Sequence, residues 1–253
     1  MKNLLVTAVV LLLAACALVA SPNLNGFSGN GVLADTSTTQ VGMIDLALDY
    51  YLNNGDMRKN TFPVRANIGL AEGFEAGVGY TFQKSEELDH NAFNVNAKYA
   101  LNVNRDLVTA AVGGKYSNIS NLATITSAFL AADINLEKYF TKDDDCDLIL
   151  TLGTTWTDID PKRSSDGRRG FRYYAALKLK DGPVTFGGQY QTRLRALENH
   201  ALYSIYAEYD LGARLSNIKA EAGYTNAGLS MVDGTGSGRL YFGLNYSFSA
   251  RQF

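Results

Sequence analysis

Two histidines are the side chains in this sequence best suited to acid–base chemistry. His90 follows Asp89, and His200 follows Glu198 and Asn199. An imidazole within reach of a carboxylate can act as a general base, which hydrolysis of a lipid or a peptide requires. Neither histidine belongs to a His-x-Ser arrangement, and both lie in polar breaks where a solvated side chain is the usual outcome. We therefore predict that the chain is not an enzyme, with a lipid or peptide hydrolase that uses one of these histidines as an alternative.

Two other polar clusters lack the spacing that their chemistry needs. Residues 143–147 (DDDCD) are rich in carboxylates but do not have the spaced Asp, Asn and Gly residues of a calcium loop. Residues 233–238 (DGTGSG) are Gly-rich but lack the Lys-Ser/Thr pair of a phosphate-binding loop, and no helix is expected after them. The sequence thus predicts neither a metal site nor a cofactor.

Composition narrows the class of protein. The chain has 23 basic and 25 acidic residues, a formal net charge of −2, which argues against a nucleic-acid partner. It has only 4 Pro but 24 Gly, 15 Tyr and 12 Phe, a composition typical of many strands joined by turns.

The N-terminus has the pattern of a targeting segment. A short basic start is followed by Leu4 to Ala20 without a charge, which predicts a cleaved signal peptide over residues 1–20. Residues 13–16 (LAAC) also resemble the lipobox of bacterial lipoproteins, in which Cys16 becomes the acylated first residue. Both routes remain open at this point. Either one leaves Cys146 as the only other cysteine, so no disulfide is expected.

One pattern then repeats along the chain, an alternating apolar and polar run followed by a polar break. None of the runs sustains a helical period, so helices are not expected. The twelve runs lie near 40–53, 61–71, 74–85, 92–103, 107–118, 124–139, 146–158, 171–181, 183–195, 201–213, 218–227 and 239–249.

Alternation alone is compatible with a soluble sandwich or a membrane barrel. The runs are longer than the ~5–6 residues of ordinary strands, and Tyr and Phe recur at the ends of their apolar faces. Long and short breaks also alternate, with 140–145 as the exception. These features predict an all-β fold, a transmembrane antiparallel up-and-down β-barrel of about 12 strands over residues 40–253. An even number of strands places the first and the last residue of the barrel on the periplasmic side of the membrane. Residues 21–39 are expected to form a periplasmic lead or a plug.

The polar face of the runs supplies the candidate functional site. Its acidic and basic side chains balance, which is compatible with a narrow polar pore or with a filled, salt-bridged interior. The predicted lumen charges are Asp45, Asp49, Arg65, Glu75, Lys98, Lys115, Asp133, Glu137, Arg172, Lys178, Arg193, Glu208 and Glu221.

The final run carries a family resemblance. Residues 243–248 (GLNYSF) resemble the last strand of Gram-negative outer-membrane β-barrel proteins, whose Gly, aromatic and terminal Phe are read by the barrel-assembly machinery. The resemblance implies that Gly243, Tyr246 and Phe248 form this assembly signal. It also implies an outer-membrane location, with membrane lipid and lipopolysaccharide around the barrel. Phe253 is an alternative end of the signal.

A second stretch is similar to the start of barrel proteins associated with exopolysaccharide export, namely residues 22–29 (PNLNGFSG) with Gly42 and Tyr50–Tyr51. This similarity implies an accessory to polysaccharide export as a further alternative. The leading hypothesis is a small porin-like or structural barrel with a polar, charge-balanced lumen.

Overall fold

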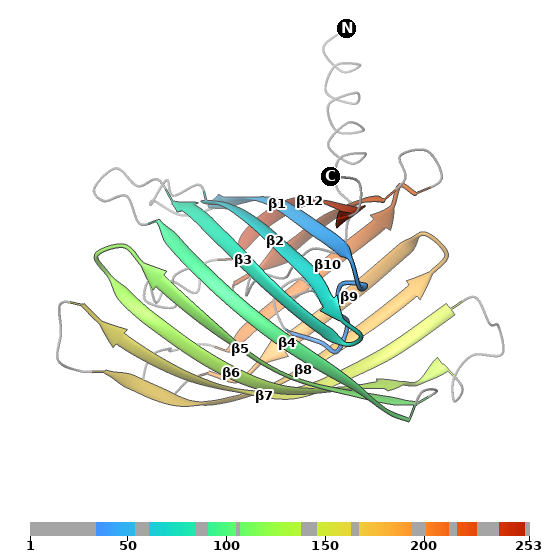
Figure 1. Ribbon diagram of the computed structural model, residues 1–253, viewed down its shortest axis with the longest axis horizontal. Coiled ribbons are helices and arrows are strands. Elements are labelled where there is room, and N and C mark those ends of the chain that lie inside the picture. Colours follow the sequence, from blue (N-terminus) through green and yellow to red (C-terminus); the bar gives the residue numbers. More distant parts are fainter. Residues whose placement is uncertain are drawn as a thin grey trace, which may run out of the picture.

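Twelve antiparallel strands form a closed barrel in the computed structural model, where they run obliquely around its wall (Figure 1). Each strand pairs with its neighbours in the chain, and β1 pairs with β12 to complete the ring. The strands are β1 (Met43–Asn53), β2 (Thr61–Ala71), β3 (Phe74–Gln83), β4 (Ala92–Asn104), β5 (Val108–Ile119), β6 (Ala123–Asn135), β7 (Cys146–Pro161), β8 (Arg168–Asp181), β9 (Val184–Gln191), β10 (Leu202–Asp210), β11 (Ile218–Thr225) and β12 (Arg239–Ser249). The structure describes residues 34–53, 61–83, 91–104, 107–137, 146–162, 167–193, 201–212, 217–226 and 238–250. The predicted fold class is confirmed.

Several strands end earlier than their sequence patterns predict, and β6 and β9 show the largest differences. The run over 124–139 ends as a strand at Asn135, because the Asn135 side chain accepts a 2.9 Å hydrogen bond from the backbone N–H of Glu137 and turns the chain. The run over 183–195 ends as a strand at Gln191. Beyond it the Thr192 backbone N–H donates to the carbonyl of Tyr173, and the Tyr173 N–H donates to the Thr192 hydroxyl. The predicted extension of both strands is therefore wrong.

The two faces of the wall differ as a membrane barrel requires. Large apolar side chains point outward and stay exposed, with 59% of Leu130 and 61% of Ile205 accessible. Polar and charged side chains point inward and are buried, and Glu75 and Arg172 have no exposed surface. A bilayer can cover the outer face, and closure of the ring leaves no strand edge unpaired in lipid. In the described part of the chain, no helix is long and apolar enough to cross a membrane.

The two ends of the barrel differ in the length of the connections between strands. The short-turn end holds the turns at residues 72–73 and 182–183, the start of β1 and the end of β12. Gly73 and Gly182 have φ values of 70° and 54°, a region that glycine enters without the steric cost of a Cβ. The long-loop end holds the other set of connections, which includes those between β1 and β2 and between β11 and β12.

Candidate functional site in the barrel lumen

The long-loop half of the lumen contains a cluster of tyrosines, a carboxylate and an ion pair. Tyr51 and Tyr241 stack with their ring centroids 5.2 Å apart, and Tyr206 packs into the same buried cluster. The Tyr241 hydroxyl donates a hydrogen bond to the carboxylate of Glu221. This arrangement satisfies the polar end of a buried aromatic ring while its faces stay in contact with other rings.

Arg65 and Asp49 form the ion pair of this half. They lie on the adjacent strands β2 and β1, and both side chains are almost fully buried. Buried charges need partners, because an isolated charge loses its hydration without compensation. The pairing therefore explains how an arginine is accommodated inside the wall.

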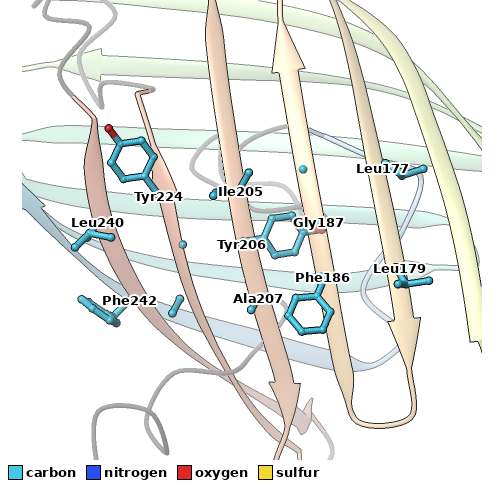
Figure 2. Close-up of a pocket in the computed structure, with 13 residues that line it drawn as sticks. Leu177, Leu179, Phe186, Gly187, Ile205, Tyr206, Ala207, Tyr224, Leu240 and Phe242 are labelled. Carbon is cyan, nitrogen blue, oxygen red and sulfur yellow. The ribbon is translucent and has the colours of Figure 1, made fainter. Parts of the chain in front are cut away.

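Inward glycines make room for the lumen aromatics. A Cβ at Gly187 would lie 2.1 Å from the Tyr206 ring, and one at Gly223 would lie 2.6 Å from the Tyr241 ring. Figure 2 shows the Tyr206 ring beside Gly187 of the neighbouring strand. The rings thus lie against the wall instead of projecting across the lumen.

The short-turn half of the lumen contains a network of carboxylates and lysines. The Lys98 ammonium lies 3.5 Å from Glu75 and 3.9 Å from Asp35, and the Lys178 ammonium lies 3.5 Å from Asp35. The Asp35 carboxylate has no exposed surface and is shared by the two lysines. A second pair joins Lys219 to Glu208 at 3.7 Å.

Residues 34–40, here called the lumen strap, cross this half of the barrel before β1 begins (Figure 1, blue coil). The Tyr174 hydroxyl donates to the carbonyl of Ala34 at 3.1 Å. Thr36 donates through its hydroxyl and its backbone N–H to Asp133, at 2.8 and 3.1 Å. The strap is therefore bonded to β8 and β6 on one side of the lumen.

The other end of the lumen strap is bonded to the opposite wall. The Thr39 backbone N–H donates to Glu75 of β3 at 2.8 Å, and its hydroxyl donates to Asp45 of β1 at 2.7 Å. Lys98 of β4 donates to the carbonyl of Ser37. Thr36 and Thr39 are both buried.

The structure brings most of the predicted lumen charges to the inner face. Buried inward-facing positions are Asp49, Arg65, Glu75, Lys98, Arg172 and Glu221, and half-buried ones are Asp45, Lys115, Asp133, Lys178 and Glu208. Two of the predicted positions, Glu137 and Arg193, lie outside the strands. Glu137 lies beyond the end of β6, and Arg193 lies beyond the end of β9 and is exposed.

The remaining predicted positions fall into two groups. Phe248 and Tyr246 share the outer face of β12, with stacked rings 5.5 Å apart, and Gly243 faces inward in register with both Asp49 and Glu221. Cys16, His90, His200 and Phe253 lie outside the described residues. Within the described ranges, no group of three His, Cys, Asp or Glu side chains is placed to hold a metal ion.

Several important lumen residues were missed from the sequence. Asp35 precedes the first strand, so no alternation could assign it to a face. Arg239 is buried and could have been found, because it shares the inward parity of Tyr241 and Gly243 on β12. The inward tyrosines follow the same parity but carry no charge that would have drawn attention to them.

The lumen charges are unevenly distributed along the barrel axis. The strand-borne charges of the long-loop half include Arg65, Lys115, Arg172 and Arg239, against Asp49 and Glu221. Those of the short-turn half include Asp45, Glu75, Asp133 and Glu208, against Lys98, Lys178 and Lys219. A sequence count that balances overall therefore conceals a basic half and an acidic half.

One apolar hollow of about 670 Å³ lies on the outer surface over β8 to β12 (Figure 2). It forms where small outward residues, among them Gly188, Ala207 and Ala222, interrupt larger ones such as Phe186 and Ile205. Most of its lining residues face the lipid side of the wall, and Gly187, Tyr206 and Gly223 also line it.

Comparisons with known proteins show which folds resemble this barrel. No protein-family model and no curated protein matches the chain. Solved structures do match, and one described as the KdgM porin is 15% identical, with a TM-score of 0.54 over 81% of this chain and 99% of that chain. The fold is that of a bacterial outer-membrane β-barrel.

Further structures of such barrels are also similar. The KdgM porin in complex with disordered oligogalacturonate is 15% identical, with a TM-score of 0.56 over 81% of this chain and 99% of that chain. The Acinetobacter baumannii outer membrane protein Omp33 is 11% identical, with a TM-score of 0.43 over 83% of this chain and all of that chain. At these identities the likeness concerns the outer-membrane barrel fold.

Proposed function

We propose that this outer-membrane barrel is a porin-like channel for passive passage of small polar solutes. The observation that carries the proposal is the closed ring of inward polar and charged side chains behind an apolar outer face. Barrels between the filled eight-stranded and the open sixteen-stranded sizes have room for a narrow passage. The similarity in fold to the KdgM porin supports the same conclusion.

Acidic carbohydrate is a candidate class of solute. One similar structure is described as a porin in complex with disordered oligogalacturonate. In this chain Arg172 and Arg239 lie in the long-loop half together with the lumen tyrosines. Guanidinium groups bind carboxylates through paired, charge-assisted hydrogen bonds, which favours an acidic solute at this level.

Single-channel recording in planar bilayers tests the channel. We expect discrete conductance steps. We also expect a reversal potential near zero in a salt gradient, because the lumen charges balance overall. The basic and acidic halves should also make the current differ between the two voltage polarities. A correctly folded barrel that gives no steps would contradict the channel and support a purely structural barrel.

The proposal includes the absence of enzymatic activity. His90 and His200, the alternative catalytic residues, lie outside the described residues, so the hydrolase alternative rests on their sequence context alone. The test compares the natural chain with a His90→Ala/His200→Ala variant on lipopolysaccharide, phospholipid and peptide. Hydrolysis by the natural chain that the double variant loses would contradict our proposal.

We also propose that the barrel-assembly machinery recognises the end of β12, and that membrane lipid and lipopolysaccharide surround the barrel. The outward stack of Tyr246 and Phe248 supports an exposed aromatic signal. Deletion of residues 249–253 should leave assembly in the outer membrane intact if Phe248 ends the signal. Loss of assembly in that deletion, with normal assembly of a Phe248→Ala variant, would assign the signal to Phe253.

A further inference from the structure

We infer that the lumen strap is the constriction of this channel, and that Asp35 is the residue that determines its conductance and ion selectivity. The inference rests on the proposed channel function. It concerns a segment that lies before the barrel strands, and it assigns that segment to the permeation path.

The lumen strap is bonded to strands on both sides of the barrel. Bonds from the lumen strap reach β8 and β6 through Ala34 and Thr36, and they reach β3 and β1 through Thr39. These strands lie on different sides of the ring. A segment bonded to both sides must cross the lumen, so solute passing through the short-turn half has to pass beside it.

The polar groups of the lumen strap are buried. Asp35 has no exposed surface, Thr39 is 4% exposed and Thr36 is 7% exposed. Their hydrogen-bonding groups contact carboxylates and lysines of the wall, so the segment is an integral part of the lumen. A segment that only rested in an open pore would keep its polar groups in water.

The carboxylate of the lumen strap also sets the charge at this level of the lumen. Asp35 lies between Lys98 and Lys178, and so it neutralises the lysines of the two strands β4 and β8. Removing its carboxylate would leave more positive charge at this level and would release the two contacts that hold the middle of the strap. Asp35 therefore controls both the width and the charge of the constriction.

The test uses two variants that separate these effects. Asp35→Asn removes the negative charge and with it both ion pairs to the lysines, whereas Thr36→Ala/Thr39→Ala removes hydroxyl contacts to Asp133 and Asp45 without a change in charge. Both should give larger single-channel steps than the natural chain. Only Asp35→Asn should shift the reversal potential, toward greater anion preference.

Asp147→Asn is the matched control. Asp147 of β7 pairs with Lys180 of β8 at 3.9 Å, and both side chains are about half exposed. This variant removes one carboxylate from the same barrel and should leave the step size unchanged. Heat-dependent mobility on gels would check that every variant is folded.

A second measurement does not depend on conductance. Ala34→Cys is introduced with Cys146→Ser, and the thiol is reacted with a water-soluble maleimide. Ala34 is only 6% exposed, so labelling should be slow in the natural background. It should become faster, on the order of tenfold, when Asp35→Asn or Thr36→Ala/Thr39→Ala is added, because local opening exposes the site.

The outcomes distinguish the strap from the channel. Step sizes and labelling rates equal to those of the Asp147→Asn control would overturn the inference. Faster labelling in folded variants that never conduct would overturn the channel function and with it the constriction. Larger steps together with faster labelling would support both.

Discussion

The hydroxyl of Tyr174 donates a 3.1 Å hydrogen bond to the backbone carbonyl of Ala34, which lies 140 positions earlier in the chain. A Cβ at Gly153 would come within 2.2 Å of the Tyr174 ring, so the missing side chain lets the ring lie against β7. The hydroxyl then reaches the strap, and the carbonyl of Leu130 on β6 is a second, longer acceptor at 3.4 Å. A glycine on one strand thus helps to place a residue that precedes all of them.

Tyr174→Phe should weaken the anchoring of the lumen strap while it preserves the ring. The variant removes one hydrogen bond from a buried site, which typically costs about 0.5–1.5 kcal/mol of stability. Urea unfolding in detergent micelles measures the change. Tyr173→Phe, on the exposed outer face of the same strand, is the control and should be closer to neutral. Equal losses in the two variants would contradict a specific role for the Tyr174 hydroxyl.

Asp49→Ala should be strongly destabilising. It leaves Arg65 buried without the partner carboxylate of β1, and breaking a buried ion pair in this way costs about 3–5 kcal/mol. Asp147→Ala breaks an ion pair whose side chains are about half exposed and should cost roughly 0–1 kcal/mol. Unfolding curves of the two variants give the comparison. A double variant, Asp49→Leu/Arg65→Met, should recover part of the loss, and failure to recover any of it would count against this explanation.

Leu130→Arg should impair insertion into lipid. Leu130 is 59% exposed on the outer face of β6, and an arginine on the lipid face near the membrane midplane costs about 2–4 kcal/mol. Leu130→Ala removes the same side chain without adding a charge and should be milder. Folding into lipid vesicles at several urea concentrations measures both. If arginine were tolerated as well as alanine, the outer face would not be facing lipid.

Adjacent glycines on β9 should respond in opposite ways. Gly187→Ala places a methyl group against the Tyr206 ring, and such overpacking typically costs about 1–3 kcal/mol. At Gly188 an added Cβ meets nothing within 4 Å, so Gly188→Ala should be neutral or slightly stabilising. Thermal unfolding compares the two variants. A Tyr206→Leu change should reduce the cost of Gly187→Ala, and an unchanged cost would place the clash elsewhere.

The strand positions were largely predictable from the sequence. Alternation predicted twelve strands, and the breaks between the runs lie at the short turns of the structure at 72–73 and 182–183. The largest exceptions lie at the ends of β6 and β9. The Asn135 side chain accepts a hydrogen bond from the backbone N–H of Glu137 after β6, and the Thr192 hydroxyl accepts one from the backbone N–H of Tyr173 after β9. Side-chain capping of this kind leaves no trace in a two-residue period.

The sequence by itself determined which face of each strand is polar, because side-chain direction in a strand alternates with every residue and needs no distant partner. It thereby determined the class of barrel and the inward position of residues such as Arg65 and Glu75. Only the tertiary structure decided which charges meet, since ring closure and strand pairing bring Lys98 and Lys178 to the same carboxylate. That carboxylate belongs to Asp35, in a segment without alternation, whose place in the lumen depends on long-range hydrogen bonds and ion pairs.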